Sequence, residues 1–466
     1  WSADTAPVPA NVAKLIFSGT TVTTTNNDFP VDSTVSGFSF LNTNSGESFT
    51  LGGNTITLAG GETRTTAAVA TGSITDTIDL GFKLNTNLQW SLGNNHGITM
   101  NGLISEVTGT PRSISASNGT ATLSLTNAGN SFTGELASQN AAFISVTSIA
   151  NGGVASAAGA GTAIRLGAAV ATAQGRFVYT GTTAASTDRT VNLAATNSAT
   201  ATLFSSGTAP ITFTGPFTNA SLATFTKTLA LGGTNTGANE ITSILGNGAG
   251  GGSLAVSLID TAAWKLSGDN TFTGGTTLGN TARLNIAHAN ALGTGTFNLG
   301  NGTFDNASGS DLTIPNAANV TGNPNFAGTS PLTIGGDTTL AGTGTRRTLV
   351  ISAGTLDSLP HNGAVVTMLA VCGCTRRQCV PDSLASRSLI DLGADHGRGR
   401  RFGNPHRLRR HAAGVFATLG RRWNRHRRCD RSDRQTWRRG GGSGHPSGRL
   451  PGHSLSTSRD PGGGDC

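Results

Sequence analysis

The sequence predicts an all-β protein made of many short strands. Runs of about four to six Thr, Val, Leu and Phe residues alternate with Gly-Gly, Gly-Asn and Asn-Gly pairs, and turn signals at roughly 8–12-residue spacing are typical of a many-stranded β fold. Early in the chain, Phe38 and Phe40 alternate with small polar residues, which indicates a strand with one buried face. A motif at residues 264–306 returns in degenerate form at 122–166, so the chain contains an internal repeat.

The clearest copy of the repeat has a fixed order of parts. Residues 264–306 read WKLSGDNTFTGGTTLGNTARLNIAHANALGTGTFNLGNGTFDN. A strand ending in LSG is followed by the corner NTFTGGTT, a strand running to Leu284 and Ile286, the turn ANALG and the segment GTFNLGNGTF. This order resembles the autotransporter-associated β-strand repeat, which occurs in the passenger domains of bacterial surface proteins. The resemblance implies an architecture and a route of secretion, and it implies no particular ligand.

The degenerate copy at 122–166 carries the same parts in weaker form. Its matching residues are Leu123, Leu125, Asn130, Phe143, Ile144 and Val146. From this alignment we expect Phe132 and Phe272 to occupy equivalent positions, both at coil corners or in the core. Opening and linking segments resemble the same family, so the resemblance extends over roughly residues 1–355.

Such a repeat is expected to form a right-handed parallel β-helix, or β-solenoid. Each coil would stack on the next at the strand spacing of ~4.7–4.9 Å, so that equivalent side chains form ladders along the axis. Val, Ile, Leu and Phe would form the inward ladders, while Gly and Asn would supply the positive φ angles that sharp corners need. The stability of such a stack is nearly additive between neighbouring coils.

The composition changes near the end of the chain. Residues 1–366 contain 12 of the 32 Lys and Arg residues and 17 of the 24 Asp and Glu residues, a balance of 12 − 17 = −5. Residues 367–466 contain the other 20 basic residues, all Arg, with seven Asp and all five Cys, a balance of 20 − 7 = +13. We therefore predict a β-solenoid domain at 1–366 and a disordered Arg-, Cys- and His-rich tail at 367–466. The mildly acidic, Cys-free first region suits a secreted surface protein and does not suit a specific nucleic-acid binder.

The tail has two interpretations. In GC-rich DNA, a codon that ends in C and is followed by a Gly, Ala or Val codon gives CGN, an Arg codon, when read from its third base. A frameshift therefore accounts for the gain of Arg and the loss of Lys and Glu. We interpret 367–466 as such a frameshift product. The alternative is a genuine basic tail that binds anionic surfaces or nucleic acid, because the Arg runs at 407–410 and 421–428 include the aromatic Trp423, as a nucleic-acid patch can.

The ends of the chain bear on secretion. The sequence opens at Trp1 without an initiator Met or a signal peptide, so we expect a processed or truncated start, and the break in the tail leads us to expect that the natural C-terminus is also missing. No run of 18 or more apolar residues occurs, and we therefore expect no transmembrane helix. Export machinery, or a C-terminal barrel outside this chain, is the expected partner for secretion.

Two motifs resemble parts of binding or catalytic sites. Gly246, Gly248 and Gly251 form a GxGxxG pattern, but SLAVSLID follows where a dinucleotide site needs a helix, so we expect a solenoid corner. His96 and His288 lack a nucleophile in a recognisable context such as GxSxG. We expect both to be surface imidazoles.

Clustered carboxylates would indicate an enzyme. Pectate-lyase-like β-helices share the predicted architecture and need such clusters for Ca²⁺ or for acid–base chemistry. Asp76 and Asp79 are three residues apart and so belong on opposite faces of a strand, while Asp311 and Asp337 are isolated. Because neighbours in a solenoid come from distant parts of the sequence, a carbohydrate-active β-helix, a polysaccharide lyase or hydrolase, is the alternative function.

The remaining patterns also have plain explanations. Cys372, Cys374 and Cys379 lack the paired C-x₂-C spacing of structural zinc sites. The TTVTTT run at 20–25 could form flat outward Thr ladders, as in some ice-binding solenoids, although strand propensity alone explains it. The sequence therefore predicts no catalytic residue, no cofactor and no metal site. We expect a structural or adhesive passenger domain, not an enzyme, which is secreted or displayed at the outer membrane of a Gram-negative-type bacterium and binds an unidentified protein or glycan.

Overall fold

The described part of the chain is a stack of parallel β-strands. The computed structural model describes residues 14–21, 23–42, 44, 47–60, 62–65, 69, 72–169, 174–340 and 350–351. Within these residues every named element is a strand, and consecutive coils pair in parallel from β1 with β4 to β34 with β37. The prediction of an all-β parallel solenoid is confirmed.

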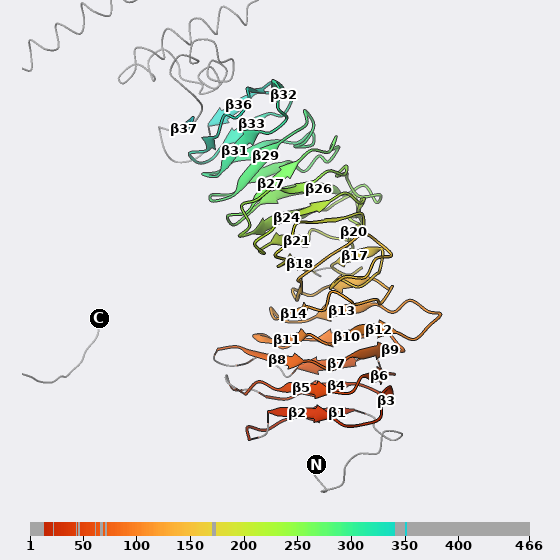
Figure 1. The fold of residues 1–466 in the computed structure, drawn as a ribbon. Coiled ribbons are helices and arrows are strands. Elements are labelled where there is room, and N and C mark those ends of the chain that lie inside the picture. Colours follow the sequence, from red (N-terminus) through yellow and green to blue (C-terminus); the bar gives the residue numbers. More distant parts are fainter. Residues whose placement is uncertain are drawn as a thin grey trace, which may run out of the picture. The chain divides into compact units, whose positions relative to one another are not determined.

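The longest sheet has fourteen strands, one from each successive coil, and follows the colours of Figure 1 from red to cyan. Its strands, in order, are β2 (Thr24–Asn27), β5 (Thr50–Gly53), β8 (Ile74–Ile78), β11 (His96–Met100), β14 (Thr122–Leu125), β16 (Phe143–Val146), β18 (Gly175–Tyr179), β21 (Thr200–Ser205), β24 (Thr226–Gly233), β26 (Ser253–Leu258), β28 (Thr276–Leu278), β30 (Phe297–Leu299), β33 (Ala318–Val320) and β36 (Thr338–Leu340). The β-branched Thr, Val and Ile of these segments favour the extended backbone.

Two further sheets follow one another along the chain. The nine-stranded sheet comprises β1 (Leu15–Phe17), β4 (Phe38–Phe40), β7 (Glu62–Thr65), β10 (Leu88–Ser91), β13 (Ile114–Ser117), β15 (Leu136–Ser138), β17 (Ala163–Leu166), β20 (Thr190–Leu193) and β23 (Phe217–Asn219). The eight-stranded sheet comprises β19 (Ala185–Thr187), β22 (Ile211–Phe213), β25 (Asn239–Ile241), β27 (Ala263–Leu266), β29 (Arg283–Ile286), β31 (Thr303–Asn306), β34 (Asn325–Phe326) and β37 (Val350–Ile351). The coils in the middle of the chain contribute strands to both sheets.

Two small sheets complete the coils. The four-stranded sheet contains β3 (Ser33–Val35), β6 (Ile56–Leu58), β9 (Phe82–Leu84) and β12 (Ile104–Glu106). The two-stranded sheet pairs β32 (Leu312–Ile314) with β35 (Leu332–Ile334). The first four coils therefore have three strands each, while β13–β14, β15–β16, β26–β27 and β28–β29 form coils of two strands.

Apolar ladders that run from coil to coil form the core. Within the fourteen-stranded sheet, one ladder joins Ile98, Leu123, Ile144, Phe177, Leu203, Leu231, Leu258, Leu278, Leu299 and Val320. All ten side chains are buried, because alternate residues of a strand point to the same face. Burial of each such side chain stabilises the fold by about 1.5–3 kcal/mol, so a continuous core holds the stack together.

Side-chain hydrogen bonds between successive coils give the coil length. Asn301 Nδ2 donates to Asn280 Oδ1 across 21 residues. The coil between β16 and β18 is longer. There Thr180 Oγ1 donates to the Val146 carbonyl, which lies 34 residues earlier in the chain. Part of the additional length lies in the connection between β16 and β17, residues 147–162, which is longer than the connection between β14 and β15, residues 126–135.

Every described residue lies before position 352. The predicted boundary between residues 366 and 367 lies outside the described residues, as does the whole predicted tail.

Candidate functional site

The repeat motif forms the same corner at both of its copies. Phe132 and Phe272 are both fully buried, which confirms their predicted equivalence. Next to the first ring, Asn130 Oδ1 accepts a hydrogen bond from the Ile104 N–H at 2.8 Å, and Asn130 Nδ2 donates to the Ala157 carbonyl at 3.2 Å. The buried amide therefore joins three successive coils.

Asn270 repeats this arrangement in the second copy. Its Oδ1 accepts from the Leu245 N–H at 2.8 Å, 25 residues earlier, and its Nδ2 donates to the Ala291 carbonyl at 2.6 Å, 21 residues later. The first corner lies between β14 and β15, and the second lies between β27 and β28, which belong to different sheets in a different order. The motif thus determines the local corner and not the face of the coil on which it lies.

A glycine packs against each buried phenylalanine. Gly159 has φ +76°, and a Cβ there would lie 2.5 Å from the Phe132 ring; Gly293 has φ +65°, and its Cβ would lie 2.7 Å from the Phe272 ring. Both positions need glycine for the backbone angle and for the close approach. The turn after each corner is therefore part of the motif.

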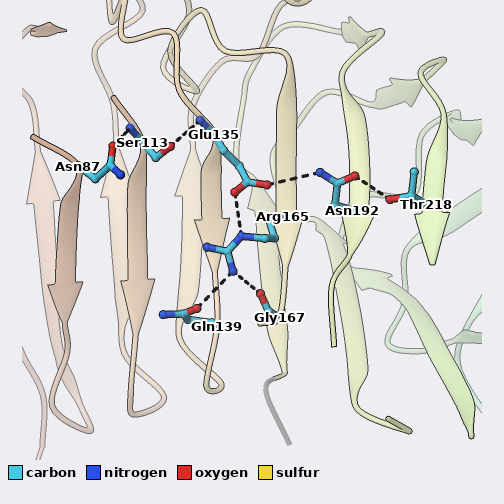
Figure 2. Close-up of polar contacts among 8 residues, drawn as sticks. All are labelled: Asn87, Ser113, Glu135, Gln139, Arg165, Gly167, Asn192 and Thr218. Carbon is cyan, nitrogen blue, oxygen red and sulfur yellow. Dashed lines mark hydrogen bonds and ion pairs between the residues drawn. The ribbon is translucent and has the colours of Figure 1, made fainter. Parts of the chain in front are cut away.

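A row of hydrogen bonds crosses the outer face of the nine-stranded sheet (Figure 2). It begins at Asn87, whose Oδ1 accepts from the Ser113 N–H at 3.0 Å. Ser113 Oγ accepts from the Glu135 N–H at 3.0 Å. These two steps each advance by one coil, so the contacts fix the register between successive strands.

Glu135 and Arg165 form the centre of this row. Arg165 Nε donates to Glu135 Oε2 at 2.8 Å, and both side chains are 27% exposed. Asn192 Nδ2 donates to the other oxygen, Glu135 Oε1, at 3.4 Å, and Thr218 Oγ1 donates to Asn192 Oδ1 at 2.7 Å. Both carboxylate oxygens have donors in the chain, so Glu135 positions its neighbours and is a poor general acid or base. A partly exposed ion pair of this kind contributes about 0–1 kcal/mol.

His96 is buried, and the prediction of a surface imidazole is wrong. Its Nε2 lies 2.7 Å from Asp76 Oδ2, and both side chains are fully buried. Asp76 Oδ1 accepts from the Phe49 N–H at 2.8 Å. The three residues lie in successive coils, so this pair joins three coils, as each buried asparagine does. The turn sequence GNNHGIT concealed this, because His96 is the first residue of β11 and its side chain points inward.

The other predicted positions follow the sequence interpretation. Asp76 is buried and Asp79 is exposed, as expected for opposite strand faces. His288 is 40% exposed and its Nδ1 lies 3.8 Å from Asp269 Oδ1, in agreement with a surface imidazole. The GxGxxG stretch is an irregular connection that leads into strand β26, in agreement with a solenoid corner.

The described residues contain no group of three or more His, Cys, Asp or Glu side chains that could hold a metal ion. Asp311 and Asp337 are exposed. In the same part of the chain, no helix has the length and apolar character needed to span a bilayer. The cysteines Cys372, Cys374 and Cys379 and the two Arg runs lie outside the described residues.

Threonines from the TTVTTT run do enter a ladder. Thr24 pairs with Thr50, Thr50 with Thr77, and Thr77 with Thr99. Thr24 is exposed and the other three are partly exposed, so the ladder faces outward. It continues through Ser124 as an uncharged outer row.

Arg189 is a buried cation that the sequence analysis missed. It is 1% exposed and donates to the carbonyls of Ala150, Ala158 and Gly159 at 2.9, 3.1 and 2.7 Å. Burial lowers the pKa of Arg189 to about 10. These bonds hold the long connection between β16 and β17 against the stack.

Lys227 is the second buried cation. It is 1% exposed and donates to the Ala195 carbonyl. Burial lowers the pKa of Lys227 from 10.5 to about 8, because the charged form loses its hydration in the interior. The alternation of β24 could have indicated the inward position, since Lys227 shares the parity of the buried Leu229 and Leu231.

The comparisons with known proteins add no family assignment. No family model matches the chain, and no curated protein or solved structure matches it either. The resemblance to the autotransporter-associated repeat therefore depends on the motif itself and on the coils that it forms.

Proposed function

We propose that the chain is a structural, adhesive passenger domain of an autotransporter-like protein, secreted or displayed at the outer membrane of a Gram-negative-type bacterium. The observation that carries the proposal is the corner shared by Asn130 and Asn270, because it connects the passenger-type repeat of the sequence with the stacking of successive coils. Outward rows of Ser, Thr and Asn accompany the stack, and such rows suit contact with a partner over many coils. The partner would be a protein or a glycan on another surface.

The engaged carboxylates favour a role without catalysis. Glu135 accepts from Arg165 and Asn192, and Asp76 accepts from the Phe49 N–H and pairs with His96. A carbohydrate-active β-helix, the alternative, would need a pair of carboxyl groups free to act on a bound sugar. Structural use of these two acids supports the adhesive role.

Attachment of cells to beads coated with the full chain tests the proposal. We expect attachment to persist at about 0.5 M salt, because contacts through uncharged rows are little screened, whereas binding through the Arg-rich tail falls steeply with salt. Beads coated with the urea-unfolded chain are the control, since they carry the same tail without the folded surface. Attachment lost at high salt, or equal on both kinds of bead, would contradict the adhesive role. Turnover of an acidic polysaccharide by the repurified chain would favour the enzyme instead.

A further inference from the structure

An aromatic cluster with one arginine lies on the outer face of the fourteen-stranded sheet. Phe143 on β16, Arg176 and Val178 on β18, and Phe204 on β21 are partly exposed, while the residues that alternate with them are buried. The two phenylalanine rings are 5.9 Å apart at 34°. The Arg176 guanidinium carbon lies 4.7 Å from the Phe143 ring centroid. These four residues, here called the aromatic platform, come from three neighbouring strands.

Arg176 keeps an unbalanced positive charge on this platform. Its Nη1 donates to the Ala141 carbonyl at 3.1 Å and its Nη2 donates to Gln174 Oε1 at 3.0 Å. Both partners are neutral, and none of the ion pairs among the described residues includes Arg176. Partial burial lowers the pKa of Arg176, which reflects lost hydration of the charged form. An anionic group placed against the guanidinium would offset that loss.

The surroundings of the platform include one carboxylate group and no free strand edge. A Cβ at Gly232, the register partner of Phe204, would lie 2.7 Å from Asp260 Oδ2, so this acid lies one strand beyond Phe204, on the side away from Arg176. Ser145 lies in register with Val178, and its Oγ is 3.4 Å from Thr180 Oγ1, so hydroxyl groups lie beside the rings. β16, β18 and β21 are all interior strands of the sheet, so their backbone groups already pair on both sides. A peptide therefore cannot add a strand here, and recognition must use the outward side chains.

We propose that the aromatic platform binds an acidic sugar, a uronic-acid residue of a polysaccharide. The sugar carboxylate pairs with the Arg176 guanidinium, the apolar face of the pyranose ring packs on Phe143 and Phe204, and a ring hydroxyl meets the partly exposed hydroxyl of Thr180. This inference rests on the proposed adhesive function and names the chemical class of its ligand. No bond is made or broken in the sugar.

Calorimetric titration of the full chain with trigalacturonate tests the inference. The comparison ligand is the methyl ester of the same trisaccharide, which keeps the rings and removes the charge. Arg176→Met keeps the apolar stem and is compared with Arg283→Met, an exposed arginine on β29 of the eight-stranded sheet. Both variants carry the same Arg-rich tail, so binding by the tail contributes equally to each. We expect Arg176→Met to weaken trigalacturonate binding about tenfold or more, as for loss of a charge-assisted contact, and Arg283→Met to leave it unchanged.

Two further variants separate the parts of the site. Phe204→Ala should weaken both the acid and the ester, whereas Arg176→Lys should leave part of the preference for the acid, because it keeps the charge and loses the planar fork. Circular dichroism and melting curves identify any variant that fails to fold. If Arg176→Met fails to fold, Arg176→Lys replaces it in the comparison with Arg283→Met.

Several results would overturn the inference. Equal losses in Arg176→Met and Arg283→Met would assign the binding to general charge, and equal affinity for acid and ester would remove the role of the carboxylate. A Glu-rich peptide that binds as tightly as trigalacturonate, with the same dependence on Arg176, would assign the platform to acidic peptides. Cell attachment that persists without uronate binding would leave the adhesive proposal standing and the ligand class wrong.

Discussion

Replacement of Asn270 by Ala is the most informative single change, because the side chain bonds the backbones of two other coils. The substitution removes the acceptor of the Leu245 N–H, bonded at 2.8 Å, and the donor to the Ala291 carbonyl, bonded at 2.6 Å. Asn270 is 2% exposed, so water does not replace either partner without opening the corner. Each buried backbone group left without a partner destabilises by about 1–3 kcal/mol. The two unpaired groups together predict that the free energy of unfolding falls by about 2–6 kcal/mol.

Asn280→Ala is the matched control. Asn280 is exposed and its Oδ1 accepts from Asn301 Nδ2 at 3.1 Å on the surface, so its loss should change stability by less than about 0.5 kcal/mol. Urea unfolding of the full chain, followed by far-ultraviolet circular dichroism, gives the change in free energy. Hydrogen exchange should locate the loss in the coils of Leu245, Asn270 and Ala291, because stability in a stack is local. If Asn270→Ala is no more destabilising than Asn280→Ala, the three-coil corner does not hold the stack as described.

Three further predictions concern the buried charges and the glycine turns. His96→Leu should destabilise by about 3–5 kcal/mol, because it leaves the buried Asp76 carboxylate without its partner, and Asp76→Asn added to it should recover part of the loss in the same urea assay. Lys227→Met should stabilise at pH 7, because it removes a buried ammonium whose desolvation costs several kcal/mol, although the unpaired Ala195 carbonyl offsets about 1–3 kcal/mol of this gain. The pKa of Lys227 is about 8 in the folded chain, against 10.5 for an ordinary lysine. The unfolded chain therefore binds more protons between these two pH values, and the stability of the fold should rise from pH 8 to pH 10. Melting curves should show this rise in the parent chain and not in Lys227→Met. Gly293→Ala should lower the melting temperature more than Gly309→Ala, because both have positive φ but only Gly293 meets neighbouring atoms.

The strand pattern was predictable because it depends on local rules. Alternation of apolar and polar residues marks the buried face of each strand, and Gly and Asn mark the corners. The equivalence of Phe132 and Phe272 could be read from the motif alone, since both begin from the same Asn-x-Phe-x-Gly order. The motif does not show which sheet each strand joins, because that depends on the number of strands in the preceding coils.

The buried polar groups were not predictable from local patterns. His96 lies in a turn-like sequence, and its burial depends on Asp76 and Phe49, which are 20 and 47 positions away along the chain and one and two coils away in the stack. Arg189 is likewise explained only by carbonyls that lie 30 or more residues earlier. Contacts of this kind arise from the stacking of coils, and a single coil carries no signal for them.

The aromatic platform was hidden for a related reason. Phe143 and Phe204 are apolar residues in strands, and each alone suggests a core position. Only the register of β16, β18 and β21 brings the two rings together with Arg176 on the outer face. The alternation of residues predicts on which side of the sheet each side chain lies. Which residue of the next strand lies beside it depends on the number of residues in the coil.

The central claim, that successive coils stack in the stated register, is tested most directly by disulfide formation between neighbouring strands. In a chain whose five Cys are replaced by Ser, Thr277→Cys is combined with Asn298→Cys, its register partner on β30, or with Asn319→Cys, which lies one strand further along the same outward row. A strand spacing of ~4.8 Å falls within the Cα separation of about 4.4–6.8 Å that a disulfide needs, and twice that spacing does not. The account predicts rapid oxidation of the first pair and none of the second. Equal oxidation of both pairs, or oxidation of the second alone, would contradict it.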